Sequence, residues 1–262
     1  MKKVIKNLWL LGIIVLVSCS NSDDSGDPGV SQDVSFTFNF THHWDGSSVT
    51  NSDFNVIQYT NANGEELSIE RLRYLISKVT FQNSNGTTTV IDGYNLIDVT
   101  NNTNLSYSPN IQIPKGTYSN VSFTFGFDNE DNIDGAYADL NTAIWNVPAM
   151  LGGGYHFMQL EGKFIDDMAA EVGYQYHAIR AVNNSDPNNL QFQDTFFTVD
   201  LGGVTIDNDI AFEIKMNIAE WFKNPIQWDL NEFHSMLMPN FGAQIMMYNN
   251  GQNVFSLDSV TQ

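Results

Sequence analysis

Residues 34–40 read VSFTFNF, and this strict alternation of apolar and polar residues decides the fold class. In an extended strand, a period of two puts Val34, Phe36, Phe38 and Phe40 on one face. The same alternating pattern occurs at residues 121–127, which read VSFTFGF. Aromatic and β-branched residues at this spacing indicate half-buried strands rather than helices.

Outward from these two stretches, the chain continues as short strand candidates separated by turn residues. Residues 196–201 and 211–218 are further strand candidates, and 78–81 with 88–91 predict a hairpin. Asn-Gly pairs tolerate positive φ and predict turns; they lie at 63–64, 85–86 and 250–251.

Helical patterns are sparse. We expect short helices within 68–77, 134–145 and 217–222. Many strands with Asn- and Gly-rich turns predict an all-β fold, a single antiparallel β-sandwich-like domain with a few short helices, over residues 33–262.

The first residues are typical of an export signal. Three lysines precede an apolar run at 8–17, which is too short to cross a bilayer, since about 20 residues are needed. The run ends in Leu16-Val17-Ser18-Cys19, which resembles a bacterial lipobox. We therefore predict a lipoprotein signal peptide over 1–18 and lipidation of Cys19. The alternative is an ordinary signal peptide with an incidental cysteine.

Residues 19–32 are polar and acidic, and we interpret them as a flexible tether. Their Ser22-Asp23-Asp24 stretch resembles the acidic export signal of Bacteroidetes surface lipoproteins, although a generic linker explains it as well. The expected location is the outer membrane, facing the periplasm or the cell exterior, with the lipid anchor as the membrane contact. Cys19 is the only cysteine, so disulfides and a thiolate nucleophile in the mature domain are excluded.

The charge balance is strongly acidic. The formal net charge is −19, and removal of residues 1–18 takes away three lysines and no acid, which gives −22. Such a chain repels nucleic acid, and no basic stripe counters this. An acidic surface attracts cations diffusely, but solubility alone explains it too.

The five histidines are the candidate metal ligands, because imidazole is the commonest ligand for copper and zinc. In a strand, residues 234, 236 and 238 share a face, so His234 could act together with Met236, a soft thioether; otherwise the methionines fill gaps in the core. His42 and His43 follow each other, so only one of them can enter a shared site. His177 shares a face with Gln175, away from Tyr174 and Tyr176.

Other features carry weaker signals. Trp145 and His156 are candidates for a pocket wall; the alternatives are a core tryptophan beside a loop and a strand-surface histidine. The acidic loop 128–135 resembles a calcium loop, but Asn141 stands where a bidentate glutamate is required, so calcium is not expected. No motif of a hydrolase, nucleotide-binding or metalloprotease site is present, and we expect no enzyme.

Several segments together are similar to the MbnP-like family, whose members are associated with copper and, in one branch, with methanobactin. The resemblance covers about residues 34–257 and is carried by these segments: 69–79 (IERLRYLISKV), 113–118 (IPKGTY), 123–128 (FTFGFD), 144–145 (IW), 154–162 (GYHFMQLEG), 176–177 (YH) and 233–236 (FHSM).

The resemblance implies a β-sandwich-like domain that binds copper through histidines. In related proteins a tryptophan oxidised to kynurenine can join the site, together with a histidine two residues later. Here Asn146-Val147 follow Trp145, so the sequence departs from that pattern.

We therefore expect a membrane-anchored copper-binding protein that captures, stores or hands over the metal to metal-transport partner proteins. The expected ligands are His177, one of His42 and His43, and His234, with Met236 in reserve. The alternative is a metal-free interaction or carbohydrate-adhesion module of the cell surface.

Overall fold

Strand β1 (Asp33–Trp44) is the centre of the first of two large sheets in the computed structural model, which describes residues 33–262. The predicted signal peptide, Cys19 and the tether lie outside these residues. The first sheet has six strands, in the order β16-β15-β1-β2, and β7 and β8 also pair with β1. Its other strands are β2 (Ser47–Val49), β7 (Ser106–Tyr107), β8 (Gln112–Pro114), β15 (Ile210–Asn217) and β16 (Phe255–Thr261).

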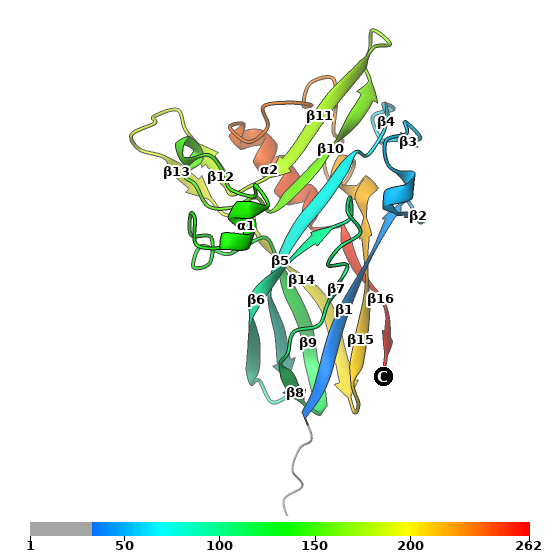
Figure 1. Cartoon of the computed structure of the whole chain (residues 1–262), viewed down its shortest axis with the longest axis vertical. Helices are drawn as coiled ribbons and strands as arrows, with labels where there is room; N and C mark the ends of the chain where they lie inside the picture. The colour runs from blue at the N-terminus through cyan, green and yellow to red at the C-terminus, as the bar shows by residue number, and fades with distance from the viewer. Residues whose placement is uncertain (1–32) are drawn as a thin grey trace, which may run out of the picture. The chain divides into compact units, whose positions relative to one another are not determined.

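The second sheet has eight strands and is antiparallel throughout, in the order β14-β9-β5-β10-β4-β3, with β6 on β5 and β11 on β10. Figure 1 shows β10 and β11 as a hairpin beside β5. The strands are β3 (Tyr59–Thr60), β4 (Glu66–Leu67), β5 (Arg71–Asn83), β6 (Thr88–Asp98), β9 (Gly116–Phe125), β10 (Met158–Ile165), β11 (Glu171–Ala178) and β14 (Phe197–Ile206).

The remaining elements are short. Strands β12 and β13 form a two-stranded sheet, and α2 is the longest helix within residues 33–262. Their bounds are β12 (Ala181–Asn183), β13 (Gln191–Gln193), α1 (Ala138–Thr142) and α2 (Phe241–Gly251), with 3₁₀ helices at Asn51–Asp53, Ala149–Leu151 and Ile218–Phe222. No helix within 33–262 is long and apolar enough to span a membrane.

The two large sheets pack face to face through the alternating aromatic residues. The ring of Phe38 on β1 lies 6.2 Å from that of Phe123 on β9, and Phe36 lies 4.9 Å from Phe81 on β5. Full burial of one such side chain stabilises the fold by about 1.5–3 kcal/mol. The prediction of an all-β sandwich-like domain is confirmed, and residues 33–262 belong to one compact unit.

One pairing departs from the antiparallel prediction. Strands β1 and β15 run parallel, in register from Phe36 with Ile210 to His43 with Asn217. A parallel pair needs a long crossover connection, which short-range turn signals in the sequence do not reveal.

The helix predictions were partly right. Helix α1 lies within 134–145, and the 3₁₀ helix Ile218–Phe222 coincides with the third candidate. The helix expected in 68–77 is wrong, because this segment enters β5. Strand β5 pairs with β6, β9 and β10, and Tyr74 to Ser77 are all buried, so no simple alternation is visible.

Helix α2 was not predicted, because Asn250-Gly251 resembled a turn. Asn250 is instead fully buried at the end of α2, where its amide donates to the carbonyls of Trp221 and Ile226. Gly251 lies against Phe197, whose ring would be 2.6 Å from an added Cβ. These two residues serve close packing and not a hairpin.

Candidate functional site

The outer face of β5, β10 and β11 forms the floor of a cleft of about 600 Å³. Strand register explains its polar lining. Gln159 on β10 pairs with Arg73 on β5 and His177 on β11, and Glu161 pairs with Arg71 and Gln175. The residues between them, such as Leu160 and Tyr176, are buried. Because side chains alternate between the two faces of a sheet, these two rows of polar side chains lie on the same outer face.

Two imidazoles meet in this cleft. The rings of His156 and His177 lie 5.2 Å apart between centroids and are nearly perpendicular, at 83°. His156 precedes β10, whereas His177 lies near the end of β11. As the alternation predicted, His177 and Gln175 line the cleft, while Tyr174 and Tyr176 are buried.

His156 has one nitrogen fixed and the other without a partner. Its Nδ1 lies 2.9 Å from the backbone carbonyl oxygen of Trp145. Since a carbonyl only accepts, Nδ1 carries the proton, and Nε2 keeps its lone pair. That Nε2 is buried and makes no hydrogen bond within the described part of the chain. Burial lowers the pKa of His156 to about 4, so the ring is neutral at neutral pH.

His177 is arranged in a comparable way. Its Nε2 lies 2.7 Å from Oε1 of Glu161, so an Nε2–H donates to the carboxylate and leaves the Nδ1 lone pair available. Glu161 also accepts from Arg71 at 2.9 Å. Burial alone would raise the pKa of Glu161, but the hydrogen bond from His177 and the charge of Arg71 lower it. A carboxylate behind a histidine is a recurrent support for metal ligands.

Unsatisfied polar atoms concentrate beside this pair. Six buried side-chain nitrogen or oxygen atoms within 33–262 lack a hydrogen-bond partner, and three of them are Arg73 Nε, Trp145 Nε1 and His156 Nε2. These residues are in contact: the Arg73 guanidinium lies 5.0 Å from the centre of the Trp145 ring, which is 5.7 Å from that of His156. Because folded proteins rarely leave buried polar atoms unpaired, their clustering marks a place for a bound group.

The predicted ligand set as a whole does not converge. His42 shares the inward face of β1 with Phe40 and is buried, with Nε2 3.0 Å from the Tyr74 hydroxyl. Burial, helped by the charge of His43, lowers the pKa of His42 to about 3. His43 points to the other face, next to Thr41. Neither lines the cleft of His177, because adjacent strand residues face opposite ways and β1 belongs to the other sheet.

Residues 234–238 do not form the extended strand in which His234, Met236 and Met238 would share a face. Residues 231–238 are turns and irregular backbone, and Met236 has a left-handed φ of 55°. His234 and Met236 line different hollows. The Nδ1 of His234 lies 3.1 Å from the carbonyl oxygen of Leu230, and its ring packs on Phe164. Met236 instead borders a neighbouring hollow that also contacts His177.

The acidic loop after β9 is held by a lysine. The ammonium of Lys78 hydrogen-bonds to Asp128 and lies 3.4 Å from Asp131 and 3.5 Å from Glu130. The hydrogen bond that Lys78 donates to Asp128 raises the pKa of Lys78, so the ammonium stays charged. A covalently attached cation thus neutralises the oxygens that a calcium ion would need.

The sequence did not reveal that Arg73 and Glu161 belong to the site. It also did not reveal that His156, predicted only as a pocket-wall residue, lies beside His177 as a candidate ligand. Their segments, 69–79 and 154–162, carry the family resemblance, and the register between β5 and β10 is what brings them together. Of the two predicted pocket-wall residues, His156 lines the cleft, whereas Trp145 does not and is fully buried against His156.

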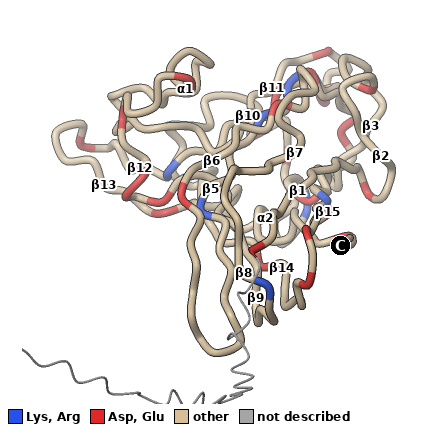
Figure 2. The backbone as a smooth tube through the Cα atoms, turned by 60° about the horizontal axis from the view of Figure 1, so that its bottom comes forward, with Lys and Arg blue, Asp and Glu red and all other residues tan. Residues whose placement is uncertain are grey.

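Acidic residues are spread over the whole described part of the chain, with few basic ones between them (Figure 2). Two of the three arginines nevertheless line the cleft. Within 33–262, no group of three His, Cys, Asp or Glu side chains is arranged to hold a metal ion. The two imidazoles and the Glu161 carboxylate line the cleft, and Glu161 is already held by His177 and Arg71.

Comparisons with known proteins agree with this fold. A sequence model of the family MbnP matches residues 33–240. Among solved structures, MbnP from Methylosinus trichosporium aligns with a TM-score of 0.51 and 13% identity, over 87% of this chain and 98% of that chain. At this identity the likeness shows the fold. No curated protein matches.

Proposed function

This chain belongs to the MbnP family, and on that premise we propose that it binds a copper ion as cargo between His156 and His177. One observation carries the proposal. The Nε2 of His156 is a buried lone-pair donor with no hydrogen-bond partner among residues 33–262, and its ring lies beside a second imidazole. We choose copper as the metal because the family is associated with copper.

The donor chemistry fits Cu(I) best. Each ring has its other nitrogen held by an acceptor, the Trp145 carbonyl or the Glu161 carboxylate, which fixes the tautomer that a metal ligand needs. Cu(I) accepts low coordination numbers and tolerates soft ligands such as thioethers. A Zn²⁺ ion prefers four ligands and is disfavoured by a two-imidazole donor set.

We propose further that the protein is not an enzyme and that it captures, stores or hands over copper outside the inner membrane. The leader sequence and Cys19 support a lipid anchor, with copper-transport proteins as partners. An exported copper carrier needs only a site that is accessible and reversible. The cleft fits this, because the His177 side chain is 12% exposed while His156 is buried behind it.

Titration of the purified mature protein with Cu(I) and Cu(II), in competition with a chromogenic chelator, tests the proposal. His156→Ala and His177→Ala should each abolish binding of one copper equivalent. The matched control is His234→Ala, which removes an imidazole outside the cleft and should bind as the wild type does. Binding weaker than about micromolar in the wild type, or cleft variants that bind as many copper equivalents as the wild type, would overturn the proposal.

A further inference from the structure

A second hollow of about 270 Å³ adjoins the cleft, and three thioether side chains line it. We call it the methionine hollow; its thioethers belong to Met150, Met236 and Met238. It shares Pro148, Gln175, His177 and Met238 with the cleft. His177 therefore stands at the boundary between the two spaces.

Two of these methionines are exposed, and the third, Met238, is partly buried against a small hydrophobic cluster. Met150 is 77% exposed and Met236 is 76% exposed, whereas Met158, Met216 and Met247 are buried in the core. A large apolar side chain at such exposure gains little from the hydrophobic effect. Met236 also keeps a left-handed backbone, which is uncommon for residues other than glycine. Packing therefore accounts for Met238 but not for Met150 and Met236, which line the same hollow.

The side chains that line the methionine hollow favour the binding of soft cations over hard ones. No Asp or Glu lines it, although the formal net charge of the chain is −19. Hard cations such as Ca²⁺ and Mg²⁺ require oxygen ligands. Thioethers favour Cu(I), and they have no proton to lose when they bind it. The donor set is that of a soft, monovalent ion.

We propose that the methionine hollow is a second Cu(I) site, which takes the ion from solvent and passes it to the imidazole pair through His177. This rests on the proposed function, since the imidazole pair is the destination. The transfer is a ligand exchange: a copper–sulfur bond is replaced by a copper–nitrogen bond, and the oxidation state does not change. The Nδ1 of His177 makes no hydrogen bond within the described residues and is the donor available for this step.

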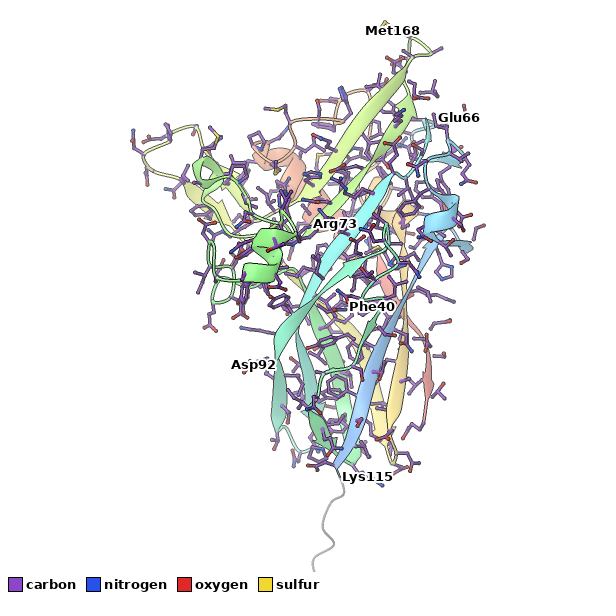
Figure 3. All side chains as sticks on the ribbon, in the orientation of Figure 1. Phe40, Glu66, Arg73, Asp92, Lys115 and Met168 are labelled. Atoms are coloured by element: carbon purple, nitrogen blue, oxygen red, sulfur yellow. The ribbon has the colours of Figure 1, made fainter. Side chains whose placement is uncertain are left out.

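The test is a titration with Ag(I), a redox-inert stand-in for Cu(I), read by mass spectrometry under native conditions. The triple variant Met150→Leu, Met236→Leu, Met238→Leu keeps side-chain volume and removes the sulfurs. It should bind one equivalent of Ag(I) fewer than the wild type. Met168→Leu is the control, because Met168 is 85% exposed and lies at the tip of the β10–β11 hairpin, away from Arg73 in the cleft (Figure 3).

A second measurement separates this inference from the proposed function. His156→Ala should lose the imidazole equivalent and keep the one in the methionine hollow. In spectra of the ε-¹³C-methyl groups of methionine, Ag(I) should shift the signals of Met150, Met236 and Met238 but not that of Met168. If the triple variant binds as many equivalents as the wild type, the inference is overturned while the proposed function stands. If His156→Ala loses nothing, the proposed function fails instead.

Discussion

The guanidinium of Arg73 lies 5.0 Å from the centre of the Trp145 ring and next to His156, so a fixed positive charge stands behind the imidazole pair. This charge opposes a bound cation and contributes to keeping His156 unprotonated. Its partner Gln159 is neutral, whereas Arg71 is paired with Glu161.

Replacement of Arg73 should therefore strengthen copper binding while it weakens the fold. In Arg73→Gln, loss of the repulsion should raise Cu(I) affinity by several-fold, and loss of the contact with Trp145 should lower the free energy of unfolding by about 1 kcal/mol. Chelator competition and urea unfolding measure the two effects. Lys215→Gln, which removes a positive charge that is paired with Asp258, is the control. Lower affinity in Arg73→Gln would contradict the prediction.

Glu161→Gln should weaken copper binding without removing a ligand. The amide keeps the shape of the carboxylate but not its charge, so it holds the Nε2–H of His177 less firmly and no longer pairs with Arg71 as an ion. Loss of such a support for a ligand lowers metal affinity by about 10–100-fold. Glu171→Gln on the same strand pair, which removes the partner of Lys163, should have no effect. Equal affinities in the two variants would exclude a supporting role for Glu161.

Stability should fall as the pH is lowered from about 6.5. Burial holds the pKa of His42 at about 3 in the folded state, below its usual value of 6.5, so the unfolded chain binds more protons between these values. The contribution of His42 is complete above pH 6.5 and is lost progressively towards pH 3. For one such group, each pH unit in this window lowers the free energy of unfolding by up to about 1.4 kcal/mol.

Urea unfolding from pH 7 to pH 4 measures this dependence. In His42→Gln, the amide can still bond to the Tyr74 hydroxyl but does not titrate, so the slope should decrease. It should not vanish, because burial also keeps the pKa of His156 at about 4. An unchanged slope in His42→Gln would contradict the buried, neutral state of His42.

Phe38→Ala should cost about 3–5 kcal/mol of the free energy of unfolding, because Phe38 is fully buried between the sheets and contacts Phe36, Phe123 and Phe212. Val56→Ala, at a side chain that is 54% exposed, should stay within about 0.5 kcal/mol of the wild type. Thermal or urea unfolding distinguishes the two. Similar losses in both variants would mean that Phe38 does not join the sheets.

Local alternation was sufficient to predict the strands that have one face in the core. It gave the inward row of β1, the β5–β6 hairpin with Val79 opposite Ile91, and the outward face of His177. It failed where both faces are buried, as in β5. It also failed at His234, because the backbone there is irregular.

Convergence of the site could not be predicted from the sequence. His156 and His177 meet only because β10 and β11 pair with Gln159 opposite His177, and because the Trp145 carbonyl orients the His156 ring. Register between strands is a property of the whole sheet, so a single histidine in the sequence carries no information about its partner.

The parallel pairing of β1 with β15 has a consequence for how the chain folds. Contacts such as the one between Asn39 and Glu213 join residues 174 positions apart. During synthesis, β1 therefore cannot pair with β15 until residues 174 positions further along the chain have been made. Closing such a long loop costs entropy before the contacts between β1 and β15 can stabilise the sheet. The sheet is therefore completed late and slowly. Until residue 210 and beyond are available, one edge of β1 stays open to pairing with other chains.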